Sequence, residues 1–197
     1  MQSEDVNFTD HKKNALAKLK SALEKNNVDS KVISLLKKIN AIDSYFTTSS
    51  CAGRIVVLQL PEIGNKKQAV FLGRWHRKVT FNEVWNALLS FEKGDAWLLT
   101  QPPIFHIGCR SLSTANELMK LGVSSGFKHS GIRSFSAQII VELQSTERMD
   151  MPLGRNGDRF VDKRIISLLV DTANTALIRA QKKLLRLENK IEDLIIK

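Results

Sequence analysis

Small polar side chains and one cation gather in TTSSCAGR, residues 47–54, directly before the apolar run IVVLQL. Hydroxyl and thiol groups can bind a ligand, a glycine lets the backbone approach it closely, and an arginine can bind a phosphate or carboxylate through two parallel hydrogen bonds. The candidate site residues here are Ser49, Ser50, Cys51, Gly53 and Arg54. The alternative interpretation is a turn of small residues with the arginine in solvent.

An aromatic ring among cations marks a second segment, GRWHRK, residues 73–78. Trp75 and His76 lie between basic residues, an arrangement that suits a nucleotide because the ring can stack on a base while the cations hold phosphates. The alternative for Trp75 is an aromatic side chain that faces the core.

Two further segments end strands with polar groups. In PPIFHIGCR, His106 shares a strand face with Ile104 and Gly108, and Arg110 follows at the strand end. His106 is interpreted as a hydrogen-bonding residue or proton acceptor at a cleft, or alternatively as a structural histidine. The segment 126–134 adds a possible tight turn, which a hairpin would equally explain, with the candidates Ser130, Gly131 and Arg133.

Common catalytic and metal-binding motifs are absent from the sequence. It has two distant cysteines and four scattered histidines, a poor set for zinc, so we expect no metal and no disulfide. It contains no GxGxxG, GxxxxGK[ST], GxSxG or HExxH motif. An enzyme with this sequence would need a less common type of site.

The charge favours a polyanionic partner. The chain of 197 residues has a net charge of +10, and residues 63–82 and 118–141 contain no acid. Nucleic acid is the first candidate, although a merely basic surface is the alternative. No apolar run approaches the ~20 residues that span a bilayer, and the polar N-terminus is unlike a signal peptide. We therefore expect a soluble cytoplasmic protein with no membrane partner.

Periodicity predicts an α/β (α+β) fold in a single domain, residues 1–197. Residues 6–43 are predicted to form a helical segment, 45–157 a strand-rich mixed-sheet core and 160–197 a long C-terminal helix. RIVVLQL and QAVFLGRW are predicted to form a hairpin, ERMDMPLGRNGD a loop, and GIRSFSAQIIVELQS one strand. The similar patterns TTSSCAGRIVVLQL and RSFSAQIIVELQS suggest a duplicated unit, with chance similarity as the alternative.

Apolar residues three and four apart form a seam along the long helix. Eight of them run from Val170 to Leu194, a spacing that requires an apolar partner. The N-terminal helical pair, packed antiparallel, is the predicted partner and implies a monomer. A dimer through this helix is the alternative.

Five segments carry a resemblance to a known family, in this order: SSCAGRI, LGRWH, PPIFHIGCRSLSTANELMKLGVSSGFKHSGI, MDMPLG and LLVDTANTALIRAQKKLLRL. Over residues 45–190 the chain resembles the tRNA wybutosine-synthesizing protein 3 family. The resemblance implies a methyltransferase that uses S-adenosylmethionine to methylate a ring nitrogen of the tricyclic guanosine derivative next to the anticodon of phenylalanine tRNA. It also implies a fold other than the Rossmann methyltransferase fold.

The resemblance also implies roles for individual residues. It implies that Pro152 belongs to the cofactor- or tRNA-binding site, and that Asn174 reaches from the long helix toward that site. As a hypothesis, His106 accepts the proton, and Trp75 stacks on the modified nucleobase or on the adenine of the cofactor. Arg54 and Arg110 bind tRNA phosphates or the cofactor carboxylate. Cys51 is expected to fill space. The alternative function is a basic tRNA- or RNA-binding protein without catalysis.

Overall fold

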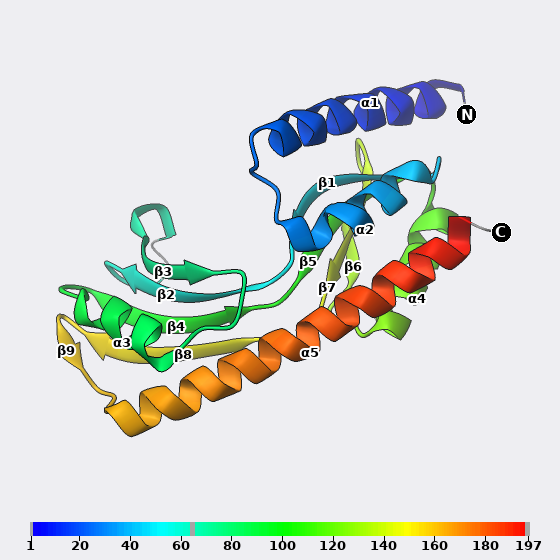
Figure 1. Ribbon diagram of the computed structural model, residues 1–197. Helices are drawn as coiled ribbons and strands as arrows, with labels where there is room; N and C mark the ends of the chain where they lie inside the picture. The colour runs from blue at the N-terminus through cyan, green and yellow to red at the C-terminus, as the bar shows by residue number, and fades with distance from the viewer. Residues whose placement is uncertain (1, 64–65, 196–197) are drawn as a thin grey trace. The chain divides into compact units, whose positions relative to one another are not determined.

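The computed structural model describes residues 2–63 and 66–195, and the side chains from residue 7 onward except that of residue 66. In chain order its elements are α1 (Gln2–Glu24), α2 (Ser30–Ala41), β1 (Tyr45–Cys51), β2 (Arg54–Leu60), η1 (Lys66–Gln68), β3 (Val70–Trp75), α3 (Phe81–Leu89), β4 (Asp95–Gln101), β5 (Ile104–Cys109), α4 (Leu112–Ser125), β6 (Gly131–Ser134), β7 (Ile139–Gln144), β8 (Met149–Arg155), β9 (Asp158–Arg159) and α5 (Lys163–Ile195) (Figure 1).

These elements form two compact units. The first unit comprises Met1–Ala52, Pro103–Thr146 and Gln181–Lys197, and the second comprises Gly53–Pro102 and Glu147–Ala180. The chain passes from one unit to the other directly after Ala52 and again between Pro102 and Pro103. Each unit has its own sheet and its own hydrophobic core.

The first unit is built on a four-stranded antiparallel sheet in the order β1-β5-β7-β6. Apolar side chains from alternate positions of its strands, such as Phe105 and Ile107, pack on α2, α4 and the last turns of α5. The opposite face of the sheet carries Phe46, whose ring centroid lies 5.2 Å from that of Phe8 on α1. This second face also carries His106.

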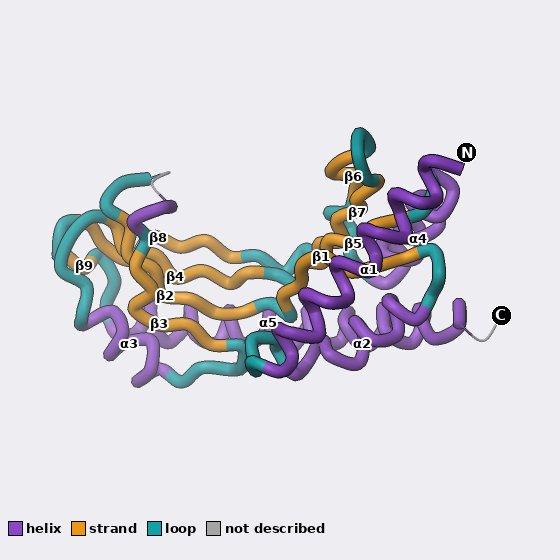
Figure 2. The backbone as a smooth tube through the Cα atoms, turned by 90° about the horizontal axis from the view of Figure 1, so that it is seen from above, coloured by secondary structure: helices purple, strands orange, loops and turns teal. Residues whose placement is uncertain are grey.

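The second unit is built on a five-stranded antiparallel sheet in the order β3-β2-β4-β8-β9. Ile55, Val57 and Leu98 point to one face and pack on α3 and on residues 163–180 of α5. Figure 2 shows β3, β2, β4 and β8 side by side in this sheet. The helix α3 begins at the predicted Thr80, which forms a capping box with Glu83. The predicted hairpin of residues 54–75 is confirmed as β2 and β3.

The long helix is confirmed, but the predicted partner of its seam is only partly right. The seam residues Val170, Ala173, Leu177, Ala180, Leu184, Leu187 and Ile191 are buried. The first of them pack within the second unit on its sheet and on α3, whereas the last pack within the first unit on α2 and the sheet. A seam of this width can cover a sheet as well as a helix, and the sequence pattern does not distinguish the two.

Two local predictions were wrong, and one alternative interpretation does not hold. Residues 47–51 are not the turn offered as the alternative but the end of β1, which pairs with β5. Residues 149–155 are not a loop but β8, which tolerates Pro152 because β9 pairs only with Gly154 and Arg155. Residues 131–144 form the hairpin β6–β7 instead of one strand. In each case tertiary pairing decided the conformation of a segment with mixed composition.

The mixed α/β fold class is confirmed. All strand pairs within the described residues are antiparallel and lie in two sheets, so neither sheet is a parallel Rossmann sheet. The single domain and the duplicated unit remain predictions.

Candidate active site

A β-bulge in β1 aims Ser49 at His106. Thr47 pairs with Ile107 and Ser49 pairs with His106, so Thr48 is an extra residue between them. Directly opposed residues of an antiparallel pair project from the same face, and the bulge therefore brings the Ser49 hydroxyl beside the imidazole. Without the extra residue, Thr48 would take the position opposite His106.

The helix α2 holds this bulge in place. Thr47 donates its backbone N–H to Asn40 Oδ1 at 2.9 Å, and Asn40 Nδ2 donates to Thr47 Oγ1 at 2.8 Å. Thr48 Oγ1 in turn donates to the backbone oxygen of His106 at 3.2 Å. These bonds satisfy polar groups that the bulge removes from the regular ladder.

A chain of hydrogen bonds crosses the four strands of the first unit. Ser49 Oγ lies 2.8 Å from His106 Nδ1, and His106 Nε2 lies 2.9 Å from Glu142 Oε2 on β7. Arg133 Nη2 donates to Glu142 Oε1 at 2.6 Å. This hydrogen-bond chain therefore begins at an exposed serine, continues through a half-exposed histidine and ends in an ion pair.

The charge on Glu142 assigns the imidazole hydrogen. Burial would raise the pKa of Glu142, which is 6% exposed, but the hydrogen bonds and charges of Arg133 and His106 outweigh burial and hold that pKa below its usual value. The carboxylate can only accept, so His106 Nε2 carries the hydrogen in the neutral ring. His106 Nδ1 is then an acceptor, and Ser49 Oγ donates to it.

Glu142 was not among the predicted site residues, although the composition of its strand indicates that it has a special role. It is the one charged residue in the apolar run IIVEL, and a carboxylate in a buried strand requires partners. Its partners, however, come from β5 and β6. Only the pairing of these strands with β7 identifies them.

Two cavities of the first unit are lined by residues of α1, and the first of them also contains Ser49. The first, which we call the α1–β1 cavity, has a volume of about 560 Å³ and is lined by Thr48, Ser49 and Ser50 and by polar residues of α1. The second, the α1–α4 cavity, has about 660 Å³ and is lined by Phe8, Arg110 and the start of α4. Both volumes fall in the range of small-molecule sites, and Phe46 lines both cavities.

Phe46 lies close to β5 because Gly108 has no side chain. A Cβ at Gly108 would overlap the Phe46 ring. The ring can therefore lie over the strand two residues from His106 and on the same face. Phe46 was not predicted as a site residue, since an aromatic residue in a strand usually belongs to the core.

Arg110 lies at the end of β5, as predicted, and lines the α1–α4 cavity. Its guanidinium carbon lies 4.7 Å from the Phe8 ring centroid, and its Nη2 donates to Asp43 O at 3.3 Å. These contacts orient an exposed cation beside an aromatic wall that includes Phe46 and Phe135. Such a wall suits a flat heterocycle and an anionic group.

The other candidates of the first unit have local contacts. Ser130 Oγ donates to Phe127 O at 2.5 Å, and Gly131 begins β6 with open space around the position of a Cβ. Cys51 ends β1 opposite Ile104 and is half-exposed. The first unit thus brings together Ser49, His106 and Arg133, with Ser50 and Arg110 at the cavities.

Six candidates belong to the second unit, and five of them lie outside α5. Gly53 has a φ of 85°, a conformation that favours glycine. Arg54 Nε donates to Gln101 Oε1 at 2.5 Å. Trp75 lies across Gly73, where a Cβ would overlap the indole, and it packs on the second core. His76 is half-buried after β3, and Pro152 is exposed on β8.

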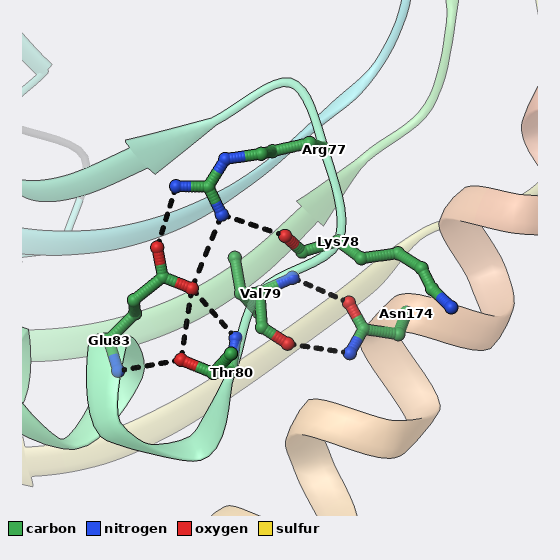
Figure 3. A network of polar contacts seen from close by, with 6 residues as sticks. All are labelled: Arg77, Lys78, Val79, Thr80, Glu83 and Asn174. Atoms are coloured by element: carbon green, nitrogen blue, oxygen red, sulfur yellow. Dashed lines mark hydrogen bonds and ion pairs between the residues drawn. The ribbon is translucent and has the colours of Figure 1, made fainter.

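Asn174, the remaining candidate on α5, binds the backbone that precedes α3 (Figure 3). Val79 donates its backbone N–H to Asn174 Oδ1 at 2.8 Å, and Asn174 Nδ2 donates to Val79 O at 2.8 Å. Both ends of the side-chain amide are therefore engaged within the second unit. The same close-up shows Arg77 bound to Glu83 beside the capping box.

The described residues form neither a metal-binding cluster nor a membrane-spanning helix. No group of three or more histidine, cysteine or acidic residues is placed to hold a metal ion in residues 2–63 and 66–195. None of the helices described is long and apolar enough to cross a membrane.

The two antiparallel sheets and the long helix define a class of α+β proteins that solved structures also represent. A structure of a Pyrococcus horikoshii protein matches with a TM-score of 0.91 and 48% identity over 95% of this chain and 97% of the other. A protein from Aeropyrum pernix matches with a TM-score of 0.74 and 27% identity over 85% of this chain and 99% of the other.

Sequence comparison identifies the family. The model of the family Methyltransferase TYW3 matches residues 10–193. A Thermococcus kodakarensis protein named tRNA(Phe) 7-((3-amino-3-carboxypropyl)-4-demethylwyosine(37)-N(4))-methyltransferase 1 is 47% identical over 95% of this chain and 96% of its own. A Methanocaldococcus jannaschii methyltransferase of the same name, without the final number, is 37% identical over 96% of this chain and 99% of its own. The chain belongs to the Methyltransferase TYW3 family and is a methyltransferase.

Proposed function

We propose that this protein methylates N4 of 7-(3-amino-3-carboxypropyl)-4-demethylwyosine at position 37 of phenylalanine tRNA. The substrate is that of its named relatives. The observation that carries the assignment to a site is the Ser49–His106–Glu142 chain, which opens onto the α1–β1 cavity at Ser49. A tRNA substrate also accounts for the net charge of +10 and agrees with a cytoplasmic reaction.

The α1–α4 cavity fits S-adenosylmethionine. Phe8, Phe46 and Phe135 can contact the adenine ring, and Arg110 can bind the carboxylate. The cofactor, when bound, supplies an electrophilic methyl group. Because Phe46 lines both cavities, a ligand in one cavity is the neighbour of a ligand in the other. We assign the acceptor base to the α1–β1 cavity.

His106 serves as the proton acceptor. The acceptor nitrogen loses a proton when it gains a methyl group. Ser49 Oγ is the polar group of the Ser49–His106–Glu142 chain that lines the α1–β1 cavity. Ser49 passes the proton to His106 Nδ1, which is 2.8 Å away. The carboxylate of Glu142, held by Arg133, stabilises the resulting imidazolium. Most of the acceleration comes from holding the reactants in contact.

Methyl transfer from labelled S-adenosylmethionine to precursor-bearing phenylalanine tRNA tests the function, with calorimetry of cofactor binding as a separate measurement. His106→Ala should lower turnover by about 100-fold or more without loss of cofactor binding. His129→Ala, which alters an exposed histidine of the same unit, is the matched control. No cofactor binding and no transfer by the unaltered protein would overturn the function, and full turnover by His106→Ala would remove His106.

A second pair of variants separates the two cavities. Arg110→Ala should weaken cofactor binding by about 10- to 100-fold, because it removes a charged partner of the carboxylate. Ser49→Ala should lower turnover and leave the cofactor dissociation constant near that of the unaltered protein. The reverse pattern would exchange the assignments of the cavities.

A further inference from the structure

An exposed phenylalanine in the second unit carries two guanidinium groups. The guanidinium carbon of Arg54 lies 5.4 Å from the centroid of the Phe71 ring, and that of Arg74 lies 5.5 Å from it. Phe71 is 47% exposed. A cation over an aromatic face is attracted by the ring, so Phe71 orients both guanidinium groups.

The strand register brings these three residues together. Arg54 starts β2, and Phe71 and Arg74 lie on the neighbouring β3, with a register shift between Val57 and Leu58. Arg54 alternates with Ile55 and Val57, which point into the second core. Arg54, Phe71 and Arg74 therefore lie on the sheet face opposite α3, and we call them the Arg–Phe–Arg cluster.

The guanidinium groups of the cluster keep donors for a ligand. Arg54 uses Nε for Gln101, which leaves its two terminal nitrogens without a protein partner in the described part of the chain. Arg74 forms no ion pair with any described acid. Contact with an aromatic ring restricts the rotation of a guanidinium and leaves its N–H groups available in the plane of the group. The cluster is thus preorganised for anions that can accept several hydrogen bonds.

Acidic neighbours do not neutralise the cluster. The carboxylates on the same face of this sheet are occupied by other arginines: Asp95 is bound by Arg155 at 2.6 Å, and Asp150 is bound by Arg148 at 2.6 Å. In the sequence, residues 63–82 contain five cations and no acid. The local excess of positive charge favours a polyanion over a single small anion.

We infer that the Arg–Phe–Arg cluster binds consecutive phosphates of a tRNA strand, with Arg54 and Arg74 as donors and Phe71 as the support that orients them. The choice of tRNA rests on the proposed function, but the contact does not depend on the site of methyl transfer. Phosphate contacts position a nucleic acid without reading its sequence. The cluster accordingly acts as a docking surface for the substrate and has no part in the proton transfer.

Binding of unmodified phenylalanine tRNA, measured by fluorescence anisotropy at several salt concentrations without cofactor, tests this inference. Arg74→Ala should weaken binding about 5- to 10-fold and lower the slope of log K against log salt by about 1. Phe71→Ala should weaken binding about 3- to 10-fold although it removes no charge. Lys93→Ala, which removes an exposed cation outside the cluster, and Val70→Ala, which truncates a residue 50% exposed on the same strand, are the matched controls.

The outcomes separate this inference from the proposed function. Unchanged tRNA affinity and salt slope in Phe71→Ala and Arg74→Ala would overturn the inference, even if the unaltered protein transfers methyl groups. Equal effects of Lys93→Ala and Arg74→Ala would also overturn it, since charge alone would then explain binding. Binding that depends on Phe71 and Arg74, without methyl transfer by the unaltered protein, would support the cluster and overturn the proposed function. Circular dichroism melting of each variant checks that the fold is retained.

Discussion

Glu142 Oε2 lies 2.9 Å from His106 Nε2, although the two residues are 36 positions apart in the sequence. Strands β5 and β7 pair so that these side chains oppose each other directly. The carboxylate accepts the hydrogen of Nε2, so Nδ1, which faces Ser49, keeps its lone pair. Glu142 thus acts through His106 and is a positioning residue in the proposed reaction.

Glu142→Gln should lower kcat by about 10- to 100-fold. The amide can donate a hydrogen bond to His106 Nε2, which would leave the hydrogen on Nδ1 and remove the acceptor for Ser49. KM should stay near that of the unaltered protein, because Glu142 lines neither cavity. Steady-state kinetics of methyl transfer measure both effects.

Glu92→Gln is the control for this substitution, since Glu92 is exposed and lies in the second unit. A structural role alone would lower the yield of folded protein without lowering the kcat of the folded fraction. A normal kcat in Glu142→Gln would contradict the positioning role.

Asn174→Ala should destabilise the second unit. It leaves the backbone N–H and C=O of Val79, a residue 4% exposed, without their two partners. Loss of partners for buried backbone groups costs about 1–3 kcal/mol. Urea unfolding followed by circular dichroism measures the change in the free energy of unfolding. Thr175→Ala, at an exposed neighbouring position of α5, should change it by less than about 0.5 kcal/mol.

Glu83 should titrate far below an ordinary glutamate. The hydrogen bond from Arg77, followed by the backbone N–H of Thr80, lowers its pKa to about 2. Because the folded pKa lies below the unfolded value of about 4.3, the stabilisation is present above about pH 4.3 and is lost as pH falls toward 2. Carboxyl NMR shifts during a pH titration measure the midpoint directly.

Arg77→Ala should raise that midpoint toward the ordinary value, whereas Lys78→Ala should not, since the Lys78 side chain forms no bond with Glu83 in Figure 3. A midpoint near 4 in the unaltered protein would show that the capping box is open in solution.

The two thiols should differ in reactivity. Burial raises the pKa of the Cys109 thiol to about 12, while Cys51 is half-exposed at the end of β1. Only a thiolate reacts rapidly with a disulfide reagent, so at pH 8 the native Cys51→Ser variant should react slowly at Cys109. Labelling with a chromogenic disulfide, before and after unfolding in urea, tests this. Fast native labelling of that variant would show that the first core opens readily.

The elements with strong internal patterns were predicted correctly from the sequence. The seam of α5, the Thr80 capping box and the hairpin β2–β3 each depend on residues close together in the chain. The motif order around SSCAGR and PPIFHIGCR also indicated the family. Local spacing carries this information because side chains three or four positions apart share a helix face, and alternate residues share a strand face.

Tertiary structure alone decided the partners. The pattern did not reveal that Thr48 is an extra residue, that Glu142 opposes His106, or that the seam of α5 covers two separate cores. It also gave no sign that TTSSCAGR divides between two units after Ala52. Strand pairing joins residues distant in sequence, and a shift of one residue reverses which face a side chain occupies. The sequence therefore identified the types of the candidate site residues, whereas only strand pairing in the folded sheets determined which of them are in contact.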